Sequence, residues 1–161
     1  MRHVISVLVR NKPGVLARVS GLFSARGFNI ESLAVGETED PEVSRMTVVV
    51  PGDDQILEQV RKQLSKLVDT IKVQDFRDVP CVTRDLMLVR VKAPAGKRGE
   101  IIEIASVFGA HIVDMAEKAL ILELTGEEDK VDRFIKMLQP YGITEMARTG
   151  RIAMLRSENG K

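Results

Sequence analysis

Apolar positions in the first half of the chain change between the two-residue period of a strand and the helical period. The β-branched run at 4–9 predicts a strand, and the apolar residues between Val15 and Phe23 fall on one helical stripe that Gly27 ends. The remaining elements predicted in this half are a strand that opens at Phe28 and bulges near Leu33, a strand at 44–50, a helix whose apolar stripe runs from Ile56 to Leu67 after a turn at 51–54, and a strand at 69–76. This order is βαββαβ, the ferredoxin-like plan, with both helices on one face of an antiparallel sheet.

The second half repeats the same plan. Its predicted elements are a strand at 86–91, a helix carrying Ile101 to Phe108, a strand opening at Gly109, a strand at 120–124, a helix at 127–138 and a strand at 141–146. Gly27 and Gly109 occupy corresponding positions, which indicates an internal duplication. We therefore predict an α+β chain with a domain at 1–77, a linker at 78–84 and a second ferredoxin-like domain at 85–161, whose closing residues 157–161 are disordered. The open face of such a sheet needs cover, so we expect dimerisation through this face or along the sheet edge.

The turn between the first strand and the first helix has the composition of an anion site. Pro13 has no N–H to lose at a helix start, and Gly14 allows close approach to the backbone. The first N–H groups of a helix lack internal partners and lie at the positive end of its dipole, so a carboxylate matches Gly14, Val15 and Leu16. The alternative interpretation is an ordinary βα turn with Asn11 as a local cap.

The composition of the chain argues against several classes of function. The chain has 161 residues and a net charge of +1, so no large basic field exists for a nucleic-acid backbone. Aromatic residues make up 4% of the chain, too few for the base-stacking platform of an RNA-recognition sheet. Cys81 is the single cysteine, which excludes an internal disulfide. No signal sequence or apolar span is evident, and we expect a cytoplasmic protein without membrane contact.

Catalysis is not supported by the distribution of reactive side chains. His3 and His111 are isolated in the sequence, and Cys81 lies in the predicted linker. An acylphosphatase-like enzyme shares the βαββαβ order, and Arg10 with Asn29 could imitate its phosphate-binding pair. Pro13, however, removes a donor from the loop that would hold a phosphate.

Two motifs in register make the chain recognisable. Asn11 to Leu16 and Gly27 to Ile30, together with Ser32 to Gly36, Arg45 to Thr47 and the duplicated length, resemble the regulatory small subunit of acetolactate synthase (acetohydroxyacid synthase). The first half of that family is an ACT domain, a small-molecule-sensing version of βαββαβ, and the second half is an ACT-like domain. The resemblance extends over nearly the whole chain.

The resemblance implies a function and a site. It implies a homodimer whose ACT interface binds a branched-chain amino acid (valine, leucine or isoleucine), with the carboxylate at Gly14, Val15 and Leu16, polar contacts from Asn11 and Asn29, and Ile30 on the apolar side. It also implies a non-catalytic subunit that activates a partner and confers feedback inhibition on it. That partner is the catalytic subunit, to which thiamin diphosphate, Mg²⁺ and FAD belong, so this chain is expected to hold no cofactor. A stand-alone ACT-type sensor of another partner is the alternative.

Overall fold

A computed structural model of the chain describes residues 1–157 and divides into two compact units. The first unit comprises Met1–Val82 and the segment that begins at Arg151, and the second comprises Thr83–Gly150. The elements of the first unit, in chain order, are β1 (Arg2–Arg10), α1 (Val15–Ala25), β2 (Ser32–Glu37), β3 (Val43–Pro51), α2 (Asp54–Ser65), β4 (Thr70–Asp75) and β9 (Ile152–Leu155), while β5 (Cys81–Lys92) starts in it. This unit therefore contains the predicted βαββαβ order and one further strand.

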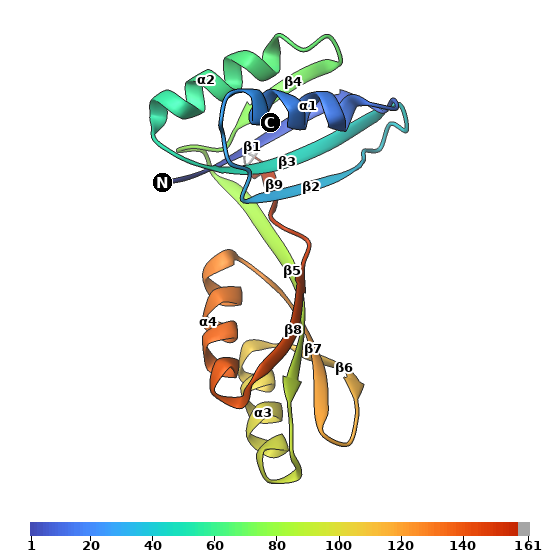
Figure 1. Ribbon diagram of the computed structural model, residues 1–161, viewed down its shortest axis with the longest axis vertical. Coiled ribbons are helices and arrows are strands. Elements are labelled where there is room, and N and C mark those ends of the chain that lie inside the picture. The colour runs from blue at the N-terminus through green and yellow to red at the C-terminus, as the bar shows by residue number, and fades with distance from the viewer. Residues whose placement is uncertain (158–161) are drawn as a thin grey trace. The chain divides into compact units, whose positions relative to one another are not determined.

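The first sheet has the antiparallel order β2-β3-β1-β4, with both helices on one face (Figure 1). Alternate residues of β1 and β3 point to the helices and pack against one stripe from each helix. The fully buried side chains of this core include Ile5, Val7, Val48, Phe23 and Leu64. The predicted fold class is confirmed, and Val15, Val19 and Phe23 of the predicted stripe are buried, whereas Leu16 is exposed.

The second strand begins later than predicted. Phe28 to Glu31 form a connection instead of a strand, because the Phe28 N–H bonds to the Phe23 carbonyl at 3.0 Å and closes the end of α1. The Phe28 ring lies edge-on to Phe23, with ring centroids 6.5 Å apart. From Ser32 to Glu37 the register with β3 is continuous, so the predicted bulge near Leu33 is wrong.

The last described strand belongs to the first unit, although no periodic pattern predicted it. Strand β9 pairs with β5, and the Arg156 N–H donates to the Pro80 carbonyl at 2.9 Å. Met154 and Leu155 line a cavity with residues on the helix-free face of the first sheet, and Ala153 is buried. The expected boundaries differ accordingly: β5 already starts at Cys81 inside the predicted linker, and the predicted second domain loses the segment from Arg151 to the first unit.

The second unit repeats the topology. Its elements are β5 (Cys81–Lys92), α3 (Ala95–Phe108), β6 (His111–Met115), β7 (Ala119–Gly126), α4 (Glu128–Leu138), the 3₁₀ turn Gln139–Tyr141 and β8 (Ile143–Arg148). The antiparallel sheet order is β6-β7-β5-β8, equivalent to the order in the first unit, with α3 and α4 on one face (Figure 1). Met87, Leu122 and Phe134 are among its fully buried residues. Residues 158–161, in the tail expected to be disordered, lie outside the described residues.

None of the helices within residues 1–157 is long and apolar enough to cross a membrane.

Candidate ligand site at the start of the first helix

Gly14 forms the N-cap of α1 in a left-handed conformation, with φ 84° and ψ −8°. An L side chain is strained at such a φ. A Cβ built on Gly14 would also lie 3.1 Å from Nη1 of Arg18, one turn further along the helix. Glycine is therefore the residue that fits this conformation, and without a side chain it leaves the backbone of the turn accessible. Asn11 is not the helix cap that the alternative interpretation required, because no side chain caps α1.

Three backbone N–H groups at this helix start are unused. Arg18 N–H reaches the Gly14 carbonyl at 3.0 Å, and Val15 N–H makes a long 3.4 Å bond to Lys12. Within residues 1–157, the N–H groups of Gly14, Leu16 and Ala17 have no protein acceptor. The first turn carries no acidic side chain. Free donors and the positive end of the helix dipole thus coincide, which is the arrangement that binds a carboxylate.

Arg18 adds positive charge beside the turn and is held in place by an ion pair with Asp69. Its Nε and Nη2 donate to Oδ2 of Asp69 at 2.9 and 2.5 Å, and the Asp69 side chain is only 14% exposed. The Asp69 carbonyl in turn accepts the Arg10 N–H at 2.9 Å. This ion pair holds Arg18 over the Gly14 turn with Nη1 still free to donate.

Asn11 ties the turn to the loop between β2 and β3. Its Nδ2 donates to Oε1 of Glu37 at 3.1 Å and to the Pro41 carbonyl at 2.9 Å, while its backbone N–H donates to the Glu42 carbonyl at 2.7 Å. Both amide protons are therefore used, and Oδ1 is left as an acceptor. Nothing in the sequence indicates that Glu37 lies close to Asn11; only the β2–β3 pairing reveals it.

The apolar members of the predicted site divide between surface and core. Val15 is 3% exposed and packs into the core, so only its backbone faces the turn, whereas Leu16 is 44% exposed. Ile30 is half-buried against the core of the first unit. The chain thus offers Leu16, and part of Ile30, as aliphatic surface.

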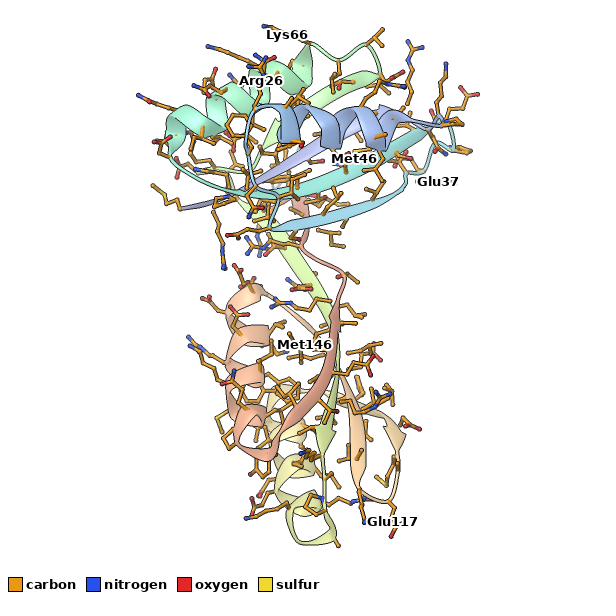
Figure 2. The ribbon with its side chains drawn as sticks, in the orientation of Figure 1. Arg26, Glu37, Met46, Lys66, Glu117 and Met146 are labelled. Atoms are coloured by element: carbon orange, nitrogen blue, oxygen red, sulfur yellow. The ribbon has the colours of Figure 1, made fainter. Side chains whose placement is uncertain are left out.

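Asn29 and Ile30 do not meet Gly14 within one chain. They follow the end of α1, whereas Gly14 precedes its start, and an 11-residue helix is about 16 Å long. Figure 2 shows Arg26 and Glu37 at opposite ends of α1, with Asn11 bonded to Glu37 at the starting end. The exposed Asn29 side chain makes no hydrogen bond among the described residues. Arg10 and Asn29 are separated in the same way, which removes the acylphosphatase-like pairing.

The candidate catalytic groups have structural surroundings. His3 is buried and its Nε2 lies 3.0 Å from the Gly52 carbonyl, and Cys81 is half-buried in β5. Within the described part of the chain, no group of three His, Cys, Asp or Glu side chains could hold a metal ion. The clearest pKa shift of a carboxyl in the second unit concerns Glu100, whose pKa is lowered by the Tyr141 hydroxyl and by Lys97. None of these groups forms a reactive constellation.

Comparison with known proteins gives the same answer for both halves. Residues 5–72 match the family model described as the small subunit-like ACT domain of AHAS, and residues 84–157 match the one described as the small subunit of acetolactate synthase. A probable acetolactate synthase small subunit of Archaeoglobus fulgidus is 58% identical over 156 residues, covering 97% of this chain and 98% of the relative. The small subunit of Mycolicibacterium smegmatis is 49% identical over 158 residues, with 98% and 93% covered. The crystal structure of the Thermotoga maritima small subunit superposes with a TM-score of 0.90 at 41% identity, covering 98% of this chain and 99% of that one.

Proposed function

The chain belongs to the family of acetolactate synthase small subunits, and on that premise we propose that it senses a branched-chain amino acid at a site shared by two ACT domains. Members of this family are non-catalytic subunits. The proposal adds that ligand binding inhibits the assembled enzyme and that the unliganded chain activates the catalytic subunit. The observation that carries the sensor assignment is the Gly14 turn, where free N–H groups, Arg18 and Asn11 lie at one corner of the first sheet.

The corner matches a zwitterion. The N–H groups of Gly14, Leu16 and Ala17 suit the carboxylate, because each can donate and the helix dipole favours negative charge there. Oδ1 of Asn11 and the carboxylate of Glu37 are the acceptors that an ammonium group needs. Donors for the carboxylate and acceptors for the ammonium group are therefore both present at this corner of the sheet.

A second copy of the chain would complete the site. Strand β2 is an edge strand, and it runs from Ser32, next to Asn29, to Glu37, next to Asn11. Antiparallel pairing of two β2 edges about a two-fold axis opposes Ser32 of one copy to Glu37 of the other. Asn29 and Ile30 of one copy would then lie beside Gly14 of its partner. Since β9 already occupies part of the helix-free face, the edge is the better candidate for dimerisation.

Aliphatic surface at the same edge would receive the ligand side chain. Leu16 is 44% exposed on α1 and Val35 is 46% exposed on the edge strand β2. Ile30 from the partner would add a third branched or aliphatic contact. Such a lining favours valine, leucine or isoleucine over polar amino acids, because burying an unpaired polar side chain there would cost free energy.

Regulation follows if the ligand prefers one arrangement of the complex. A change from mostly active to mostly inactive enzyme needs about 5 kcal/mol of differential binding. Two symmetric sites in a dimer share that requirement. Under this proposal the catalytic subunit carries thiamin diphosphate, Mg²⁺ and FAD, and the small subunit acts on it only through the interface between the two subunits.

Isothermal titration of the full chain tests the sensor assignment. We expect valine, leucine or isoleucine to bind saturably, near one ligand per chain in a dimer whose mass is measured in parallel, and lysine not to bind. Inhibition of the reconstituted enzyme by the same amino acid tests the regulatory part. Binding without any effect on that enzyme would favour a sensor of another partner.

A mixing experiment tests whether the site is shared. Gly14→Asp removes the carboxylate position and Asn29→Ala removes the opposing amide, so each homodimer should bind poorly. In a mixed dimer, both changes fall on one of the two sites and the other site is intact. Recovery of ligand binding after the two variants exchange subunits is expected, and no recovery in proven heterodimers would show that the site lies within one chain.

A further inference from the structure

The helix-free face of the first sheet carries a cavity that the amino-acid site does not use. It has a volume of about 160 Å³ and lies between the sheet and β9. Its floor is made by residues of β1, β3 and β4, and Met154 and Leu155 of β9 form one wall. At about 30 Å³ per water, the space corresponds to roughly five water molecules. It can therefore admit a small organic molecule.

Two cations from different strands face this cavity. The register places Leu8 directly opposite Arg45 on one side and Lys72 on the other, so the three side chains form one row across the sheet. Neighbouring Cβ atoms in such a row are about 5 Å apart, which puts the two cationic side chains within reach of one small ligand. No carboxylate within residues 1–157 forms an ion pair with either of them, and none lines the cavity.

A buried hydroxyl lies beside the cations. Ser6 is 1% exposed, and its Oγ accepts a bond from Nη1 of Arg45 at 2.9 Å. The Ser6 hydroxyl proton has no acceptor among the described residues, so it remains available to a ligand oxygen. This bond also directs the Arg45 guanidinium to the floor of the cavity instead of to solvent.

The rest of the lining is largely apolar: Leu8 lies between the two cations on the floor, and Phe76, Met154 and Leu155 add further apolar surface. We propose that this cavity binds a small carboxylic acid whose carboxylate contacts Arg45, Lys72 and Ser6 and whose short aliphatic part contacts β9. An amino acid fits less well, because no carboxylate is there for its ammonium group. A bare phosphate would place oxygens against the apolar wall.

The probe is butyrate, with butyramide as the neutral control of the same shape and inorganic phosphate as the anion without an apolar part. The full chain is labelled with ¹³C in its methionine methyl groups, and the Met154 signal is assigned with Met154→Leu. We expect butyrate to shift the Met154 signal saturably, more weakly at high salt, without moving the signal of Met137 in α4. An equal response to butyramide, a response to phosphate alone, or no response to butyrate would overturn the proposal.

Variants separate this cavity from general charge effects. Lys72→Gln should weaken butyrate binding about tenfold, since a bond to a charged group is lost. Lys66→Gln removes the same charge at the end of α2 on the helix side, where Figure 2 shows Lys66, and should leave the affinity unchanged. Gly14→Asp should also leave it unchanged, because the amino-acid site is separate. Arg45→Gln should also weaken butyrate binding, independently of Lys72→Gln. Undiminished butyrate binding in the Arg45→Gln/Lys72→Gln double variant would contradict the assignment.

Discussion

The two units start their first helices differently, although their sheets have equivalent strand orders. In the first unit the N-cap of α1 is Gly14 with φ 84°, whereas in the second the N-cap of α3 is Pro94 with φ −62°. The residues four positions after these caps are both arginines, Arg18 and Arg98. Arg18 is held by Asp69 and leaves the helix start open. Arg98 instead closes its corner.

Arg98 closes the second corner by binding backbone carbonyls. Its Nη2 donates to the carbonyls of Ala93, Ala116 and Glu117, the latter two at the end of the β6–β7 hairpin, where Figure 2 shows Glu117. In the first unit, Asn11 fixes the equivalent β2–β3 loop through the Pro41 carbonyl. The duplicated fold therefore solves one structural problem in two ways. The Asn11 amide spans its turn and leaves the start of α1 open, whereas the Arg98 guanidinium folds over the start of α3.

The largest expected effect comes from placing a fixed charge in the open corner. Gly14→Asp should weaken binding of the amino acid by about a hundredfold or more, because carboxylate contacts worth ~1.5–3 kcal/mol are replaced by repulsion. Gly14→Asn is the matched control, since Asn and Asp tolerate a left-handed φ similarly and differ in charge. Titration calorimetry of both variants separates charge from backbone strain. Equal losses would mean that strain, and not a carboxylate position, explains the effect.

The closed corner should matter for stability instead of binding. Arg98→Ala should lower the free energy of unfolding of the second unit by about 2 kcal/mol, because three carbonyls lose a charged donor that is partly buried. Arg18→Ala should cost the first unit less, about 1 kcal/mol, because the Arg18 side chain of this ion pair is half exposed even though Asp69 is not. Native-state hydrogen exchange reports on each unit separately. A loss for Arg98→Ala no larger than that for the exposed Arg133→Ala would contradict the closing role.

Asn11 should contribute both to holding the β2–β3 loop and to binding the amino acid. Asn11→Ala removes the bonds to Glu37 and Pro41, so the loop loses its tie and the ligand loses the Oδ1 acceptor. We expect amino-acid affinity to fall about tenfold, the effect of losing bonds worth ~1–1.5 kcal/mol. Asn11→Asp keeps the size of the side chain but places a second negative charge near Glu37. Because this charge repels the carboxylate of the ligand, Asn11→Asp should also bind the amino acid more weakly than the unchanged chain does. Unchanged affinity in both variants would remove Asn11 from the site.

Local patterns predicted most of the fold because they depend on burial. The spacing of Val15, Val19 and Phe23 located one helical face, and these three residues are the buried ones of α1. Strand β9 was missed because only Ala153 of its four residues is buried, which leaves no periodic signal. In the structure Asn11 lies at the starting end of α1, in the turn that contains Gly14. The predicted site could not show that Asn29 lies at the other end of α1, since that depends on the direction of the helix across the sheet.

The closing role of Arg98 could not be predicted from the sequence, for a different reason. Its three acceptors are backbone carbonyls, which every residue carries, so no side-chain pattern in the sequence marks them. Only the pairing of β6 with β7 brings the hairpin end to the start of α3. Contacts of this type can be read from structure alone, and they are the ones that distinguish the two corners.

The smallest expected effect is on the pKa of Glu100, on the exposed surface of α3 in the second unit. The Tyr141 hydroxyl donates to Oε2 of Glu100 at 2.8 Å and, with Lys97, lowers the pKa of Glu100. A lowered carboxyl pKa contributes stability above its ordinary value, and that contribution is lost as the pH falls through the lowered pKa. Tyr141→Phe removes the largest cause of the shift, so the pKa of Glu100 should rise towards its ordinary value.

The readout is the ¹³C signal of the Glu100 carboxyl, titrated from about pH 6 to about pH 3, where glutamates ionise. Lys97→Gln provides a second variant, because it removes the other hydrogen bond and a nearby positive charge, and it should also raise the midpoint. An unchanged midpoint in Tyr141→Phe would mean that the hydroxyl does not bind Glu100 in solution. The first unit should be unaffected in either variant, because both residues lie in the second unit.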